Sequence, residues 1–172
     1  MNGACRGVSF RDPSDQNCSV TGTIVTMNSS ILKLDDPELD EDHAVFQQLI
    51  LSLLMSPRGE TIQALDALRT HASSHFSTED ADLRRLGGSN AHCRLDEHAA
   101  VLRSLEEVRA VVSSRRLEHH VEARLVDSLA NELLHWLPAH VQEMDAAVAQ
   151  QRSKERWGGA PLQFLSGNRK LS

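Results

Sequence analysis

Four histidines and one glutamate interrupt helical stripes that are otherwise apolar. Three- and four-residue spacing places each of them on the buried face of a helix. Burying these groups without partners would cost several kcal/mol, whereas metal ions held between facing helices would satisfy them together. One such histidine alone is more often a satisfied core residue, but five ligand-type residues from separate segments favour a shared metal site. The five are His43, His75, Glu79, His98 and His140.

Two pairs of candidate ligands have informative spacings. His75 and Glu79 lie four residues apart, so both project from one helical face and can approach one metal. His140 and Asp145 lie five residues apart, which is roughly 140° around a regular helix. Asp145 therefore reaches the site only if the helix widens locally, as π-type turns at functional sites do. A solvated helix surface is an equally good interpretation of Asp145.

The remaining histidines fit such a site less well. His119 and His120 stand at a junction between a loop and a helix and are expected at the surface. His71 flanks the predicted site by one turn, with a surface role favoured. Glu132 and His135 form the Glu-x-x-His pattern of ferritin-like di-iron proteins, but the pattern occurs once and lies beside the apolar stripe.

Four amphipathic segments carry these residues, and strand-like alternation is nowhere sustained. Asp36-Pro37 is a typical helix start, and Gly87-Gly88 ends a helical pattern that Ser89 or Asn90 can cap anew. Three- and four-residue steps alternate along the stripes, as left-handed bundle packing requires. The helices are expected at about residues 37–55, 60–86, 91–113 and 117–150.

Short connections between these segments predict an all-α fold, an up-down-up-down antiparallel four-helix bundle over residues 35–150. Residues 1–34 are rich in Ser, Asn, Thr, Gly and Asp and are expected to form a flexible N-terminal extension. Met27 lies just before the patterned region and is an alternative start. Residues 151–172 are expected to form an irregular C-terminal tail.

The composition argues against several classes of protein. A formal net charge of −6 provides no basic surface for nucleic acid. The longest apolar run, residues 49–55, is far shorter than the ~20 residues that span a bilayer. No secretory signal is visible, and the three cysteines lack a C-x-x-C pair, which argues against a disulfide scaffold and fits a reducing compartment. We therefore expect a cytoplasmic protein that binds neither nucleic acid nor membranes.

Several motifs occur in an order that resembles the bacterial hemerythrins over about residues 35–164. The resemblance implies a di-iron centre inside an antiparallel four-helix bundle, with O2 bound at an open iron position. The same ligand types also suit zinc or manganese. The motifs are LDEDH ending at His43, HFSTE from His75 to Glu79, DEH ending at His98, and WLPAH ending at His140, followed by Asp145. By position in the family pattern, one iron would be held by His43 and His75, the other by His98 and His140, with Glu79 and Asp145 bridging them.

Arg94 departs from the family pattern, which carries a histidine four residues before the position of His98. Arginine stays protonated and offers only donors, so it is not a plausible ligand. His92 lies two residues earlier, roughly 200° around the helix, and could substitute only through an irregular helix start. Three outcomes are open: other ligands complete the second iron, the site holds one iron or binds iron weakly, or Arg94 extends to solvent and leaves the site less enclosed.

The leading hypothesis is a non-haem iron protein that binds O2 or a related small ligand such as an anion, with an altered iron site. Oxygen storage, transport, sensing and detoxification would share this site. No nucleophile–base arrangement and no phosphate-binding glycine loop appears, so no enzymatic activity is expected. Two alternatives are a metal-poor helical interaction module, which Arg94 favours, and a metal-dependent oxidase or peroxidase, which an opened coordination position favours. The sequence leaves the oligomeric state open.

Overall fold

A computed structural model of the chain describes residues 33–87 and 91–158, and every regular element in these ranges is helical. The predicted all-α fold is confirmed, and the first three helices begin and end within one residue of their predicted bounds. A π-helical segment joins the last two helices. The elements are α1 (Pro37–Leu54), α2 (Thr61–Leu86), α3 (Ala91–Ser113), α4 (His119–His140), η3 (Val141–Asp145) and α5 (Ala146–Trp157).

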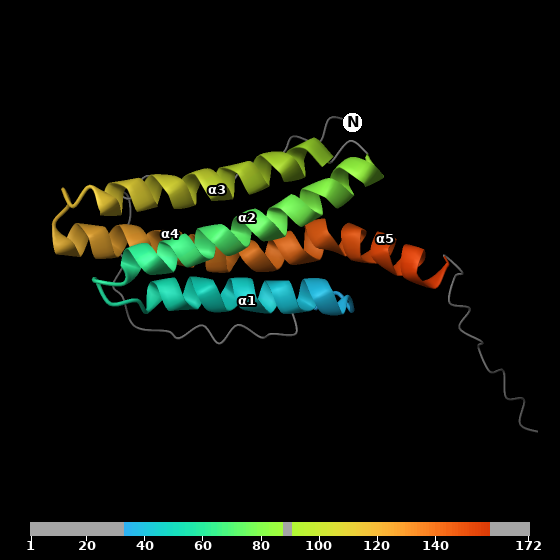
Figure 1. Cartoon of the computed structure of the whole chain (residues 1–172), viewed down its shortest axis with the longest axis horizontal. Helices are drawn as coiled ribbons and strands as arrows, with labels where there is room; N and C mark the ends of the chain where they lie inside the picture. The colour runs from blue at the N-terminus through green and yellow to red at the C-terminus, as the bar shows by residue number, and fades with distance from the viewer. Residues whose placement is uncertain (1–32, 88–90, 159–172) are drawn as a thin grey trace, which may run out of the picture.

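Helices α1 to α4 lie side by side, and successive helices run in opposite directions along the long axis (Figure 1). Helix α1 packs against α2 and α4, and α3 packs against the same two helices. Helix α5 extends the direction of α4 beyond η3 and contacts α2 (Figure 1). The arrangement is a helical bundle with an added helix at one end.

Local sequence signals set the helix ends. The side chain of Asp36 accepts hydrogen bonds from the backbone N–H groups of Glu38 and Leu39, at 3.2 and 3.4 Å, which satisfies donors that a helix start leaves free. Helix α2 ends at Gly87, whose φ of 64° favours glycine. The predicted capping residues Ser89 and Asn90 lie outside the described residues.

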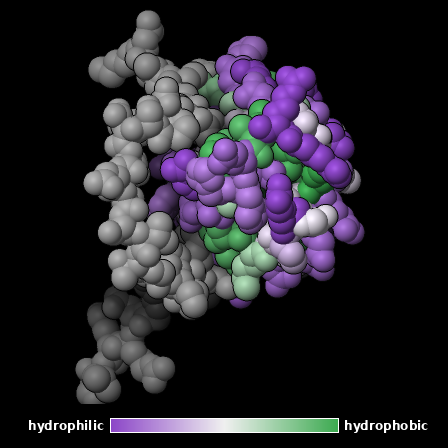
Figure 2. All heavy atoms as spheres, turned by 90° about the vertical axis from the view of Figure 1, so that its left-hand side faces the viewer, coloured by the Kyte–Doolittle hydropathy of each residue, from purple (hydrophilic) through white to green (hydrophobic). Residues whose placement is uncertain are grey.

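The apolar side chains form two clusters within the described residues. The larger cluster fills the half of the bundle that contains the 55–60 and 114–118 connections, and the polar interior residues lie beyond it. It includes Phe46, Ile50 and Leu105. Seen from that end, the bundle shows mostly hydrophilic side chains with hydrophobic atoms between them (Figure 2). The smaller cluster lies at the opposite end and joins α1, α2 and α5. Its buried members are Leu39, Leu83, Val148 and Ala149.

The end of the chain differs from its prediction, because residues 151–157 continue α5 instead of forming an irregular tail. Residues 146–157 contain no proline or glycine, and the helix ends at Gly158, which has a φ of 72°. Steps of three and four residues that continue beyond His140 predict that Ala147 faces inward. Ala147 is exposed, since the π-helical segment rotates the following residues and buries Val148 and Ala149 instead. The rest of the predicted tail, and residues 1–32 of the predicted extension, lie outside the described residues.

Among residues 33–87 and 91–158, no helix combines the length and apolar character that crossing a bilayer requires.

Candidate metal centre

The structure brings together all six residues that the sequence analysis proposed as ligands. Every one of them is at most 2% exposed, and they come from α1, α2, α3, α4 and η3. Their candidate ligand atoms form two groups that share Glu79, and within each group the atoms lie within 4.8 Å of one another. One group contains His43, His75, Glu79 and Asp145, and the other contains Glu79, His98 and His140.

The carboxylate of Glu79 lies between two pairs of imidazoles. Its Oε1 atom is 3.2 Å from Nε2 of His75 and 3.8 Å from Nε2 of His43. Its Oε2 atom is 3.5 Å from Nε2 of both His98 and His140. Each oxygen of Glu79 therefore faces one pair of histidines.

Asp145 reaches the same interior because the helix widens where the five-residue spacing requires it. The π-helical segment η3 adds a residue to the turn between His140 and Asp145, and Pro138 just before it has no N–H to continue the α-helical ladder. Oδ2 of Asp145 lies 3.0 Å from Nε2 of His43 and 3.4 Å from Nε2 of His140. Asp145 thus connects the two groups of candidate ligands.

Three acidic residues that the sequence analysis did not select contact the outer sides of the imidazoles. Their signal in the sequence is that each adjoins a candidate ligand in the chain. Carboxylates that accept the Nδ1–H of an imidazole fix its tautomer and aim Nε2 at a metal. The contacts to Nδ1 are Asp42 Oδ2 to His75 at 3.2 Å, Asp80 Oδ1 to His98 at 2.6 Å, and Glu97 Oε2 to His140 at 3.9 Å.

The inner atoms of this cluster are left without hydrogen bonds from the described residues. The buried atoms without such hydrogen bonds include both oxygens of Glu79 and the Nε2 atoms of His75, His98 and His140. A buried carboxylate with no donor is costly, and a cation between these atoms would remove the cost. Imidazole nitrogen and carboxylate oxygen are ligands for divalent iron, zinc and manganese, so the donor set fits a metal.

Aromatic rings surround the imidazoles on the side of the large apolar cluster. The ring of Phe76 stacks on His98 at a centroid distance of 4.2 Å, and that of Trp136 stacks on His140 at 4.3 Å. Phe46 meets His75 edge-on at 5.7 Å. These contacts hold the imidazoles in one orientation and keep water away from that side.

Comparison with known families places this cluster in context. The model of the hemerythrin HHE cation binding domain matches residues 35–151, which contain all six candidate ligands. The chain belongs to the hemerythrin HHE family. Searches of curated proteins and of solved structures found no significant match. The resemblance predicted from the motifs is confirmed at the level of this cation-binding family.

Burial and carboxylates act in opposite directions on the hemerythrin-family histidines. Burial lowers the pKa of His43, but Asp145 and Glu79 outweigh it and raise that pKa to about 9. Burial also lowers the pKa of His140, and the same two carboxylates with Glu97 raise it to about 9. For His75 and His98 burial prevails, and their pKa values lie below 6.5. The cluster therefore holds protons at neutral pH when it holds no metal.

Arg94 stands one turn before His98 on α3, at the departure from the family pattern. Its side chain is half-buried, and its Nε atom is buried without a hydrogen-bond partner among the described residues. His92 is exposed on a helix that is regular from Ala91, so it does not replace the missing ligand.

The other histidines lie outside the cluster. His119, His120 and His135 are exposed, as is Glu132 of the Glu-x-x-His pattern. His71 is half-buried instead of lying at the surface: its Nε2 donates to the carbonyl oxygen of Asp42 at 3.1 Å. It therefore supports the segment that contacts His75.

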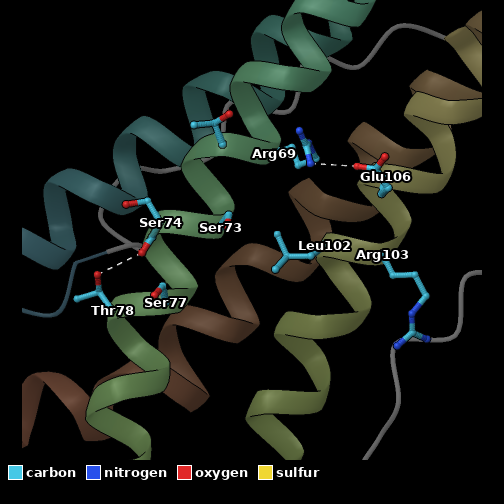
Figure 3. A pocket seen from close by; sticks show the side chains of 9 residues that line it. Arg69, Ser73, Ser74, Ser77, Thr78, Leu102, Arg103 and Glu106 are labelled. Atoms are coloured by element: carbon cyan, nitrogen blue, oxygen red, sulfur yellow. Dashed lines mark hydrogen bonds and ion pairs between the residues drawn. The ribbon is translucent and has the colours of Figure 1, made fainter.

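A larger open groove of about 800 Å³ lies away from this cluster, between α2 and α3 (Figure 3). Hydroxyl side chains of α2 line one wall, and Leu102 and Arg103 of α3 line the other. Arg69 pairs with Glu106 across it at 3.1 Å. None of the six candidate ligands is among the described residues that line it, so its size does not make it the site of the family's chemistry.

The contact between Asp80 and His98 gives a first prediction. Asp80→Ala removes the acceptor that holds His98 Nδ1, so the affinity for Co²⁺ should fall by about 10–100-fold. The control is Asp96→Ala, because Asp96 is exposed on the helix that carries His98. Competition with a coloured chelator measures the Co²⁺ affinity of each variant. Equal affinities in the two variants would show that Asp80 does not position the imidazole.

The raised pKa values give a second prediction. Metal binding needs neutral imidazoles, so at pH 7 it should release about two protons per chain, from His43 and His140. The release should decrease as the pH rises toward 9, and the apparent affinity should increase over the same range. Calorimetry in buffers of different ionisation enthalpy counts the protons. A release near zero at pH 7 would contradict the charged state of these two residues.

Proposed function

We propose that this hemerythrin-family chain is a non-haem iron protein that holds a di-iron centre and binds O2 or a related small ligand there. The single observation that carries the proposal is the carboxylate of Glu79. Both of its oxygens are buried without hydrogen bonds from the described residues, and each faces a pair of imidazole nitrogens. Two metal ions, one for each oxygen, satisfy this arrangement.

The assignment of ligands follows the two groups. His43 and His75 would hold one iron, and His98 and His140 would hold the other. Glu79 and Asp145 would bridge the two, since each lies within 4 Å of histidines from both pairs. Mixed imidazole and carboxylate ligands suit iron chemically. The functional unit that we propose is the bundle, residues 35–150.

Iron bound by this set would supply a redox-active centre with a coordination position for O2 or a small anion. The protein's own residues prepare that position. Asp42 and Asp80 hold His75 and His98 with Nε2 directed inward. Phe46, Phe76 and Trp136 exclude water from one side of the cluster, which strengthens electrostatic interactions within it.

A second candidate function is favoured by Arg94, which stands one turn before His98 where the family pattern carries a histidine. The metal held by His98 and His140 would therefore lack one imidazole that the family pattern supplies. A metal with fewer protein ligands has more positions for substrates, which favours a metal-dependent oxidase or peroxidase. Consumption of O2 or hydrogen peroxide that depends on an added reductant would support this function over binding alone.

Iron analysis of the purified chain tests the proposal. Protein produced in iron-replete medium should contain about two iron ions per chain and absorb in the near-ultraviolet through charge transfer from ligand to metal. His75→Ala should lose iron and unfold at lower temperature, because bound metal stabilises the folded state. His135→Ala is the matched control, since His135 is exposed. Less than one iron per chain in the unaltered protein would favour a metal-poor interaction module instead.

Arg94 provides a prediction about the altered site. Arg94→His restores an imidazole one turn before His98, so iron affinity should rise by about tenfold or more and occupancy should increase. Arg103→His is the control, because Arg103 is an exposed arginine on the same helix. Iron content and azide-binding spectra measure the effect. Equal results for the two variants would mean that Arg94 does not stand in the place of a ligand.

A further inference from the structure

The burial of the candidate ligands raises the question of how a metal ion reaches them. Each of the six is at most 2% exposed. A cavity of about 110 Å³ reaches two of them, His75 and Glu79, from the side of the bundle. This volume has room for several water molecules. Glu38 and Asp42 of α1 and Arg152 of α5 also line it.

The acidic side chains of this cavity form a series of decreasing exposure. The side chain of Glu38 is 81% exposed, that of Asp42 is 46% exposed, and that of Glu79 is 1% exposed. Glu79 is also the residue whose oxygens are buried without hydrogen bonds among the described residues. A lining with three carboxylates attracts cations and repels anions. The series therefore leads from solvent to the unsatisfied carboxylate.

Arg152 is the arginine among the described residues of this lining, and carboxylates of α1 and α2 hold its side chain. Its Nε and Nη2 atoms both lie 2.8 Å from Oδ2 of Asp82, and its Nη1 lies 3.8 Å from Glu38. The side chain is 16% exposed. Its position depends on α5, which Val148 and Ala149 attach to the bundle. A cation that passes from Glu38 to Glu79 through this cavity therefore moves through a space that the guanidinium lines.

We propose that this cavity is the route by which divalent cations reach the metal site, with Glu38 and Asp42 guiding them inward and Arg152 acting as a gate. The inference rests on the proposed function, because it presupposes that the six residues bind metal. It concerns the rate of metal uptake and release, whereas the ligand set determines the equilibrium affinity. Rate and affinity therefore separate the route from the site.

Uptake of Co²⁺ by the metal-free full chain tests the route, followed by stopped-flow visible absorption. Arg152→Gln removes the positive charge from the path and should accelerate uptake by about fivefold. Glu38→Gln removes an attracting carboxylate at the surface and should slow uptake by about twofold. Release of Co²⁺ to excess EDTA should change by the same factor in each variant, so that the affinity stays constant.

Two matched controls remove the same charges nearby. Arg85→Gln is the control for Arg152, because Arg85 also pairs with Asp82, at 2.8 Å, but does not line the cavity. Glu155→Gln is the control for Glu38, because Glu155 is likewise an exposed acid at this end of the bundle that does not line the cavity. Both controls should take up Co²⁺ at the rate of the unaltered chain.

Each outcome decides between the proposals. If Arg152→Gln and Glu38→Gln take up Co²⁺ at the same rates as their controls, the proposed route is wrong. The proposed metal site is unaffected by that result. Faster uptake without faster release in Arg152→Gln also overturns the route, since the arginine would then act on affinity. Glu38 is so exposed that Glu38→Gln should fold normally. If Arg152→Gln unfolds, the uptake rate of Glu38→Gln therefore tests the route. An unaltered chain that takes up neither Co²⁺ nor iron overturns the proposed function together with the route.

Discussion

A buried carboxylate without hydrogen-bond donors is the constraint on which the rest of this structure depends. Glu79 is fully buried, and its two oxygens face four imidazole nitrogens with no hydrogen bond from the described residues. In a medium of low polarity such a charge is tolerated only beside positive charge. Protons on His43 and His140 supply it when no metal is present, which is why the pKa of each rises to about 9 despite burial. Metal ions would supply it otherwise, and protons and metal then compete for the same atoms.

The bundle surrounds this charged interior with apolar layers on both sides. The larger apolar cluster fills one half of the bundle, and the smaller cluster of Leu39, Leu83, Val148 and Ala149 lies beyond the polar residues. The polar centre is thus enclosed along the bundle axis by side chains that exclude water. The smaller layer needs α5, so the added helix completes the enclosure and also carries Arg152 to the side of the site. The hemerythrin-family bundle and its additional helix act together on access to the interior.

Residues outside the candidate ligand set carry much of the organisation. The acids at positions 42, 80 and 97 adjoin candidate ligands in the chain, yet Asp42 and Asp80 contact an imidazole on a different helix from their own. One short sequence segment therefore supplies both an inner group and the outer support of a neighbouring helix. Arg94 is the exception, since its buried Nε has no partner among the described residues where the family pattern carries an imidazole. With an imidazole at this position, the group of Glu79, His98 and His140 would have one more candidate ligand.

The amino-acid sequence by itself determined the helices and the set of interior polar residues, because the spacing of apolar residues and the proline and glycine breaks are local properties. It also indicated that His140 and Asp145 could meet only through a widened turn. It did not determine that α5 continues to Trp157, that Ala147 turns outward, or that Asp42, Asp80 and Glu97 contact imidazoles. Those features depend on the rotation that η3 introduces and on the packing of separate helices against each other. Tertiary structure alone decided them, because contacts between residues far apart in the chain have no local signal. Such contacts depend on how whole helices are rotated and shifted along their axes relative to each other.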